Sequence, residues 1–312
     1  MCYDRLLLTT GSAPRRLRLH GADLDGVEYL RSLADADHLT AELRNVAHVV
    51  VIGAGWIGSE VAASARQLGR EVAMVDPGAV PLQRVLGTEV GAVYRDRHAD
   101  HGVDLHLATG VESLHGSRRV EEVRLTDGTR LPADLVVVGI GAAPRVDLAA
   151  AAGLEVGDGI VVDAHLRTGV ADIFAAGDVA AAFHPGLGAR IRVEHWANAL
   201  HQATVAAKNL LGIPAAYDRV PYFFSDQYDL GMEYSGYPTA WDRVVFRGDP
   251  ADGAFIAFWL ADDVVVAGMN VNVWDVTDSI QQLVRDRVAV DADRLADPDA
   301  PLSTLAGSYA RH

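Results

Sequence analysis

The sequence contains a single cysteine, Cys2, among its 312 residues. One thiol excludes a disulfide framework, a zinc site built on cysteines and a CxxC redox pair within this chain. Basic residues are also scarce, because 27 Lys and Arg stand against 42 Asp and Glu, for a formal net charge of −15. Nucleic acids and anionic membrane surfaces both bind basic proteins, so neither is an expected partner.

Long apolar runs are missing as well. No stretch approaches the roughly 20 residues that span a bilayer, and the apolar stretch after Arg5 is too short for the core of a secretory signal. We therefore expect a cytoplasmic protein. Half of the residues are hydrophobic and 22% are charged, which is typical of a folded chain with extensive cores. This length accommodates two or three domains.

The most specific motif is the segment VVVIGAGWIG at residues 49–58. It places a glycine-rich turn between an apolar strand and a helix, which is the context in which GxGxxG binds a dinucleotide. Gly53 permits the tight turn, Gly55 lets the backbone approach a pyrophosphate, and Gly58 lets helix and strand pack closely. The N–H groups at the start of the helix then bind the phosphates.

An acidic residue, Asp76, closes the second strand of this unit, 18 residues after Gly58. Its carboxylate is expected to accept hydrogen bonds from the adenosine ribose and to repel a 2′-phosphate. Pro77 and Gly78 follow, so no arginine is at hand to neutralise that phosphate. The motif therefore favours NADH over NADPH.

Two further strand-and-glycine patterns follow, LVVVGIGAAP at 135–144 and FAAGD at 174–178, and a simple NAD-binding domain requires neither. Asp127-Gly128 predicts a two-residue hairpin turn. Periodicity and end signals predict helices over 88–101, 194–211 and 275–287, and strands near 243–248, 254–260 and 264–273. The tail around Pro298 and Pro301 is expected to be loosely ordered.

Four motifs, in order, resemble one family. The segments YDRLLLTTGSAPR, GAGWIGSE, GIGAAPRVDL and DIFAAGDVA are similar to those of the pyridine-nucleotide, FAD-dependent oxidoreductases. Two more, RVEHWANALHQATVAAKNLLG and PYFFSDQYDLGMEYSG, narrow the resemblance to the ferredoxin-reductase and rubredoxin-reductase branch. The resemblance covers nearly the whole chain.

The resemblance implies an α/β fold with two Rossmann-like nucleotide-binding domains and a small C-terminal α+β domain. Residues 1–44 and 142–214 would belong to the FAD domain, 45–141 to the inserted NAD domain and 215–312 to the C-terminal reductase domain. The family's first βαβ unit, which carries its own GxGxxG for the FAD pyrophosphate, would precede Tyr3. We therefore expect an incomplete FAD domain, from a truncated chain or a misplaced start codon.

The resemblance also assigns site residues. Glu60 would lie near the nicotinamide and is the candidate catalytic residue. Asp178 would accept from the ribityl hydroxyls, and Trp196 would lie beside the pyrimidine edge of the flavin. The full set implied for FAD is Thr10, Gly11, Arg15, Gly177, Asp178, Glu194, His195, Trp196 and Phe224. The set for NAD is Gly53, Gly55, Trp56, Ile57, Gly58, Asp76 and Gly141, and no residue is assigned to a metal.

The activity implied is that of an NADH-dependent flavoprotein reductase that passes electrons through FAD to a ferredoxin-like iron–sulfur carrier. An acidic carrier would need a local basic patch, for which Arg15, Arg16 and Arg18, or Arg190 and Arg192, are candidates. Two alternatives stay open: an NADH oxidase or nitrite-reductase-like flavoprotein, and an inactive NAD-binding remnant that lacks the ADP half of the FAD site.

Overall fold

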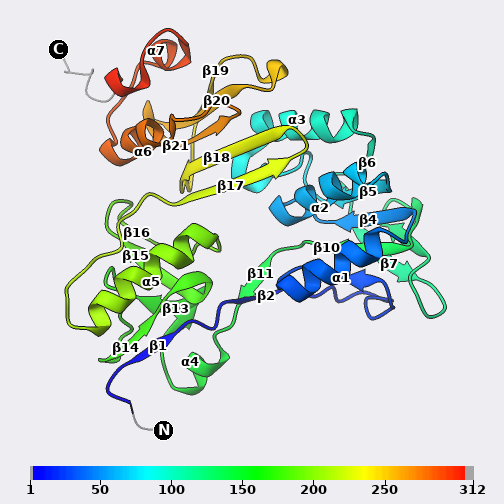
Figure 1. Ribbon diagram of the computed structural model, residues 1–312, viewed down its shortest axis with the longest axis horizontal. Helices are drawn as coiled ribbons and strands as arrows, with labels where there is room; N and C mark the ends of the chain where they lie inside the picture. Colours follow the sequence, from blue (N-terminus) through cyan, green and yellow to red (C-terminus); the bar gives the residue numbers. More distant parts are fainter. Residues whose placement is uncertain (1–2, 306–312) are drawn as a thin grey trace. The chain divides into compact units, whose positions relative to one another are not determined.

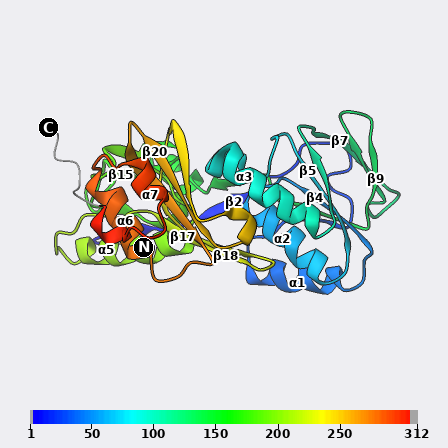
Figure 2. The ribbon, with the colours of Figure 1, turned by 90° about the horizontal axis from the view of Figure 1, so that it is seen from above.

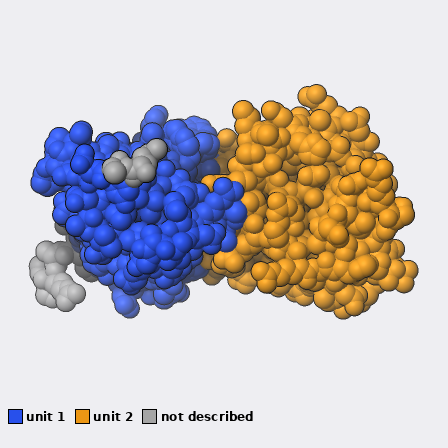
Figure 3. Space-filling model, turned by 90° about the horizontal axis from the view of Figure 1, so that it is seen from below, with its two compact units in different colours: residues 1–13, 143–224, 232–312 blue, residues 14–142, 225–231 orange. Residues whose placement is uncertain are grey.

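The computed structural model describes residues 3–305, so Cys2 lies outside the described residues. The chain divides into two units, shown in different colours in Figure 3. Unit 1 comprises Met1–Ala13, Ala143–Phe224 and Met232–His312, and unit 2 comprises Pro14–Ala142 and Ser225–Gly231. The four-part domain division given above stays a prediction beside this one.

Unit 2 is built on a five-stranded parallel sheet in the order β3-β10-β4-β5-β6, of which Figure 1 labels β10, β4, β5 and β6. Its strands are β3 (Val27–Glu28), β10 (Leu135–Val138), β4 (His48–Ile52), β5 (Glu71–Asp76) and β6 (Val103–Leu107). The central strands are continuous apolar runs because both faces of the sheet are covered. Ile52 pairs with Val138 on one side and with Val75 on the other, so the three strands end together.

Alternate residues of the central strands enter two separate cores. Val49 and Val51 pack with α1 (Leu33–Leu43) and α2 (Trp56–Gln67), which Figure 2 shows side by side along the sheet. Val50 and Ile52 face the antiparallel sheet of β7 (Val111–His115), β8 (Glu122–Leu125) and β9 (Arg130–Pro132). The predicted turn at Asp127-Gly128 joins β8 and β9 and is confirmed.

Two helices of unit 2 refine the predictions. The predicted helix at 88–101 is confirmed as the main part of α3 (Gln83–Asp100), which kinks at Gly87 with a φ of 79°. Helix α1 was not predicted, although Ser32 and Asp35 carry its start signal. The Ser32 side chain accepts from the Asp35 N–H, and the Asp35 carboxylate accepts from the Ser32 N–H.

The first part of unit 1 contains two small sheets and one long helix. Strand β1 (Leu6–Leu8) pairs in parallel with β14 (Ile173–Ala175). A second sheet has the order β12-β13-β15-β16, from β12 (Val156–Gly157), β13 (Gly159–Val162), β15 (Ala180–His184) and β16 (Ala189–Ile191). The short helix α4 (Asp147–Ala151) and the predicted long helix, observed as α5 (Trp196–Leu210), accompany them. Where the chain passes between units, β2 (Ser12–Pro14) pairs with β11 (Ala142–Pro144).

The C-terminal part is a five-stranded sheet in the order β17-β18-β21-β20-β19. The three predicted strands are β19 (Arg243–Arg247), β20 (Phe255–Ala261) and β21 (Val264–Val271), and the predicted helix is α6 (Thr277–Asp286). Strands β17 (Tyr222–Gln227) and β18 (Leu230–Gly236) were not predicted.

The expectation of a loose tail is wrong for the described part of it. Helix α7 (Ala292–Ala296) and a 3-10 turn (Leu302–Thr304) follow α6, and Leu295, Leu302 and Leu305 are buried in the core of the C-terminal sheet. The mixed α/β class with a C-terminal α+β part is confirmed. Within residues 3–305, none of the helices combines the length and apolar character that crossing a membrane requires.

Candidate functional site

The glycine turn of unit 2 lies where β4 passes into α2, and two of its glycines are required by the protein's own packing. Gly53 has a φ of 100°, and a Cβ there would lie 2.5 Å from the carbonyl oxygen of Gly139. A Cβ on Gly58 would lie 1.9 Å from the carbonyl oxygen of Gly53. Glycine at position 58 therefore lets α2 lie close to the end of β4, and glycine at position 53 lets the end of β4 lie close to the end of β10.

Gly55 is different, because no protein atom lies within 4 Å of the position its Cβ would occupy. It is exposed, it is the N-cap of α2, and its φ of −77° is open to any residue. Trp56 and Ile57 follow as the first residues of the helix, whose early N–H groups have no partner inside the helix. The absent side chain leaves room for something other than protein, which fits a pyrophosphate on a helix N-terminus.

Asp76 has a second role that the sequence analysis did not foresee. Its Oδ2 accepts from the Ala54 N–H at 2.8 Å, and its Oδ1 accepts from the Gly78 N–H at 2.7 Å. The carboxylate therefore holds the glycine turn in place as well as ending β5. A carboxylate offers about four acceptor positions, so Asp76 keeps acceptor capacity for ribose hydroxyls.

The second glycine pattern is explained by the topology. Strand β10 pairs in parallel with β4, so Gly139 and Gly141 follow it beside the turn that begins at Gly53. Gly141 has a φ of 100°, and its carbonyl accepts from the Arg15 N–H at 2.9 Å. Arg15 thus lies in unit 2 beside a residue assigned to NAD, whereas the other residues assigned to FAD lie in unit 1.

Glu60 lies on α2, one turn past the glycine turn, and contacts polar groups. Its Oε1 accepts a hydrogen bond of 2.5 Å from the Ser225 hydroxyl. Burial raises the pKa of Glu60 above its ordinary value, the Ser225 hydrogen bond opposes that shift, and the nearby charge of Asp226 adds to it. The phenol of Tyr94 is fully buried, and its ring packs edge-on against Trp56 with centroids 6.2 Å apart. Ser225, Asp226 and Tyr94 were not among the predicted site residues.

Residues assigned to FAD gather at the ends of β1 and β14 in unit 1. Because these strands are parallel and in register, Thr10 and Gly11 follow β1 at the same edge at which Gly177 and Asp178 follow β14. The Thr10 hydroxyl donates to the carbonyl of Arg145 at 2.7 Å. The Gly177 N–H donates to Oε1 of Gln202 at 2.8 Å, which links the middle of α5 to the same edge.

The start of α5 presents one partly buried and one exposed aromatic ring. His195 is the N-cap, and its ring lies 4.2 Å from the centroid of Phe223, a contact that the sequence analysis missed. Its Nδ1 is buried and has no hydrogen-bond partner among the described residues. Trp196, the next residue, is 72% exposed.

An unpartnered buried imidazole nitrogen beside an exposed indole is costly in the protein alone, since buried polar atoms are normally hydrogen-bonded. A planar heterocycle with donors and acceptors at its edge would satisfy the nitrogen of His195 and cover Trp196. The residues present here therefore fit a flavin. Thr10, Gly11, Gly177, Asp178, His195 and Trp196 are the residues that would hold it.

Two other residues assigned to FAD lie differently. Glu194 forms an ion pair of 2.5 Å with Arg192, whose guanidinium also contacts Asp158 at 3.1 Å. Phe224 is 56% exposed, and it alternates along β17 with the buried Phe223. Glu194 thus anchors an arginine, while Phe224 offers an exposed ring.

Burial lowers the pKa of His195 to about 4, although the charge of Asp178 opposes the shift. His195 is therefore neutral when folded and gains a proton near its ordinary pKa of about 6.5 when unfolded. The unfolded chain binds more protons between these values, so the stabilising contribution is present above pH 6.5 and is lost as the pH falls toward 4.

We expect the unfolding free energy of unit 1 to fall by about 2 kcal/mol between pH 7 and pH 5 on account of this residue alone. Urea titrations followed by tryptophan fluorescence measure it. The His195→Leu variant should lose that part of the pH dependence, and an equal decline in the variant would contradict the assignment.

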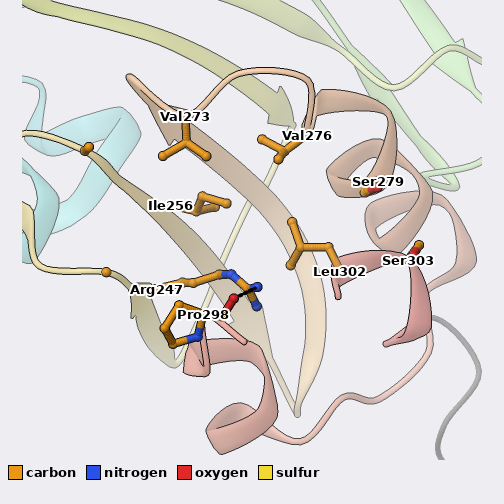
Figure 4. A pocket seen from close by; sticks show the side chains of 10 residues that line it. Arg247, Ile256, Val273, Val276, Ser279, Pro298, Leu302 and Ser303 are labelled. Carbon is orange, nitrogen blue, oxygen red and sulfur yellow. Dashed lines mark hydrogen bonds between the residues drawn. The ribbon is translucent and has the colours of Figure 1, made fainter. Parts of the chain in front are cut away.

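A separate pocket of about 410 Å³ lies in unit 1 between the C-terminal sheet and the tail (Figure 4). Apolar side chains dominate it, and Arg247 is its charged member. The Arg247 guanidinium donates to the carbonyls of Pro298 at 2.9 Å and Ala300 at 2.7 Å, so it holds the tail. None of the predicted site residues lines this pocket.

Unit 2 thus has a glycine turn suited to a dinucleotide, and unit 1 contains residues suited to a second, flavin-like group. The pyridine nucleotide-disulphide oxidoreductase family model matches residues 1–203, and a model described as reductase C-terminal matches residues 222–306. The chain belongs to the pyridine nucleotide-disulphide oxidoreductase family.

Named relatives are similar over almost the whole chain. The ferredoxin–NAD(+) reductase component of an anthranilate 1,2-dioxygenase system from Burkholderia cepacia is 42% identical, over 97% of this chain and 75% of that protein. The ferredoxin reductase for the CYP199A2 system from Rhodopseudomonas palustris superposes with a TM-score of 0.94 at 37% identity, covering 98% and 76%. The reductase in a covalent putidaredoxin reductase–putidaredoxin complex gives 0.93 at 37%, with the same coverage.

Proposed function

We propose that the chain is a reductase that takes a hydride from NADH onto bound FAD and delivers electrons to a ferredoxin-like iron–sulfur carrier. The observation that carries the proposal is the open space beside Gly55. At the other two glycines of the turn, protein atoms already occupy the space where a side chain would lie. Relatives named as ferredoxin reductases support the acceptor.

The chain's own residues would bind and orient the two nucleotides. Gly55 and the start of α2 hold the pyrophosphate of NADH, Asp76 accepts from its ribose, and Glu60 orients the nicotinamide. Flavin supplies the ability to accept a hydride and to release electrons singly. The N-terminus of α5, behind Trp196, directs its partial positive charge toward the bound ring and favours negative charge there.

The docking surface for an acidic carrier is proposed on unit 2. Arg190 donates to the carbonyl of Ala181 at 2.8 Å, and Arg192 is paired with Asp158 and Glu194, so both serve the fold of unit 1. The group Arg15, Arg16 and Arg18 is the better candidate. Arg16 lies 4.1 Å above the ring of Tyr29, which holds its charge near the surface.

The domain division of 1–44 and 142–214 for FAD, 45–141 for NAD and 215–312 for the C-terminal domain is part of the same proposal. So is a cytoplasmic location, which the low cysteine content fits, because disulfide-rich chains are typical of oxidising compartments.

The acceptor is tested by reoxidation. Protein supplied with FAD and reduced by NADH is mixed either with a ferredoxin or with air-saturated buffer. We expect ferredoxin to reoxidise it much faster, and added salt to slow that reaction because opposite charges steer the encounter. Faster reoxidation by oxygen would favour an NADH oxidase instead.

A further inference from the structure

A row of hydrogen-bonded side chains reaches Glu60 within unit 2. Glu60 stands on α2, one member stands on α3, and three come from residues 225–231 at the end of β17 and in the turn that follows it. We call this row the Glu60 chain, and it consists of Glu60, Ser225, Gln227, His98 and Tyr228.

The contacts run without a gap from Tyr228 to Glu60. The Tyr228 hydroxyl lies 3.0 Å from His98 Nδ1, and His98 Nε2 lies 3.1 Å from Gln227 Oε1. Gln227 Nε2 donates to the Ser225 hydroxyl at 3.4 Å, and that hydroxyl donates to Glu60 at 2.5 Å. Ser225 and Gln227 are 3% and 1% exposed, and His98 is fully buried.

Chemistry fixes the direction of every bond in the Glu60 chain. A carboxylate only accepts, so Ser225 must donate to Glu60 and receive from Gln227. The carbonyl oxygen of Gln227 then accepts from Nε2–H of His98, which leaves Nδ1 of His98 to accept from Tyr228. All donors therefore point toward Glu60, and hydrogen bonds aligned in one direction polarise and strengthen one another.

The same chain is unsuited to moving a proton. A neutral amide, such as that of Gln227, cannot pass a proton on without becoming a high-energy tautomer. Burial also lowers the pKa of His98 to about 4, so its ring stays neutral at ordinary pH. The arrangement therefore orients the carboxylate and does not relay protons to it.

We propose that Ser225 is a positioning residue that fixes the Glu60 carboxylate for the nicotinamide, and that Gln227, His98 and Tyr228 hold the Ser225 hydroxyl in its donating orientation. The inference rests on the proposed function, since it presumes that Glu60 faces NADH. It assigns part of the NADH site to residues 225–231, which lie more than 160 positions along the chain from Glu60.

Other titratable groups face the Glu60 chain and must be counted in any pH effect. Asp226 and Tyr94 interact with Glu60, His101 interacts with His98, and Arg66 interacts with Tyr228. Asp226 and burial favour the protonated form of Glu60, whereas Ser225 favours the carboxylate. Loss of the Ser225 hydroxyl must therefore raise the pKa of Glu60 further.

Carbon-13 NMR of carboxyl-labelled glutamate tests this without cofactor turnover. The Glu60 signal is assigned by its absence in Glu60→Gln, and its titration midpoint is compared among variants. We expect Ser225→Ala to raise the midpoint by about one pH unit. Ser225→Thr should restore it, because threonine keeps the hydroxyl. Tyr228→Phe should raise it by a smaller amount.

Thr277→Ala provides a matched control. The Thr277 hydroxyl donates to Glu233 at 2.5 Å in unit 1, so this variant removes an equally short hydroxyl–carboxylate bond from the other unit. It should leave the Glu60 midpoint unchanged. Thermal melting of each variant confirms that folding is retained.

NADH affinity, measured on the same variants across pH, separates the role of Ser225 toward Glu60 from the role of Glu60 toward NADH. We expect the pH at which affinity changes to move with the Glu60 midpoint in Ser225→Ala. An unchanged Glu60 midpoint in Ser225→Ala overturns the positioning role of Ser225, whatever the NADH affinity of that variant. A shifted Glu60 midpoint in Ser225→Ala supports the positioning role of Ser225. If Glu60→Gln nevertheless leaves NADH affinity unchanged, Glu60 does not lie beside the nicotinamide.

Discussion

Replacing Gly55 with alanine is expected to weaken NADH binding by about tenfold to a hundredfold while leaving the fold of unit 2 intact. A Cβ at this position meets no protein atom within 4 Å, and its backbone conformation suits alanine. The added methyl group would occupy only the space that we assign to the pyrophosphate. Titration of NADH against the variant measures the effect.

Gly58→Ala is the matched comparison, because it adds the same methyl group three residues away. Its Cβ would lie 1.9 Å from the Gly53 carbonyl oxygen, so helix and strand must separate. We expect a loss of about 3 kcal/mol in the unfolding free energy of unit 2 together with weaker binding. Trp56, the one tryptophan in residues 14–142 and 225–231, reports that unfolding. Full NADH affinity in Gly55→Ala would remove the basis of the proposed site.

Asp76→Asn is expected to reduce the preference for NADH over NADPH by about tenfold to a hundredfold, because it removes the charge that repels a 2′-phosphate. It should also destabilise unit 2 by about 1–3 kcal/mol. The asparagine amide has one oxygen for the two backbone N–H groups of Ala54 and Gly78. One of these N–H groups would therefore face the amide NH2 group, which is itself a donor.

Asp134→Asn is the control for the loss of charge, because it removes a backbone-bound carboxylate elsewhere in unit 2. Asp134 also accepts from two backbone N–H groups, those of Ala47 at 3.0 Å and His48 at 2.8 Å, but it lies at the opposite ends of β4 and β10. Both of these N–H groups donate to the same atom, Oδ2 of Asp134, so the amide oxygen of asparagine can keep them, and we expect a smaller loss of stability and no change in the ratio of NADH to NADPH affinity. An equal change of that ratio in both variants would show that Asp76 does not face the ribose.

The sequence predicted the glycine turn between β4 and α2 well because its geometry is local. Gly53, Gly58 and Asp76 belong to one strand–helix–strand segment, and each residue type follows from the backbone geometry at its own position. The parallel pairing of β10 with β4 needed the structure, although the apolar run at 135–138 and its glycines signalled a strand end.

Contacts between distant segments could not be predicted in this way. Neither the bond from Ser225 to Glu60 nor the packing of Phe223 on His195 has a periodic signal, since each depends on how separate elements meet. The missed strands β17 and β18 are rich in aromatic and polar residues. Their alternation becomes clear only once buried and exposed faces are known.

The central claim is that NADH bound at the Gly55 turn delivers a hydride to flavin bound by this chain. The most direct measurement is the loss of visible flavin absorbance after anaerobic mixing of the FAD-supplied protein with NADH. We predict rapid loss that slows when the transferred hydrogen of the nicotinamide is deuterium, and that requires far more NADH in Gly55→Ala. Absorbance that stays constant in the unaltered protein, or falls equally fast in the variant, would contradict the account.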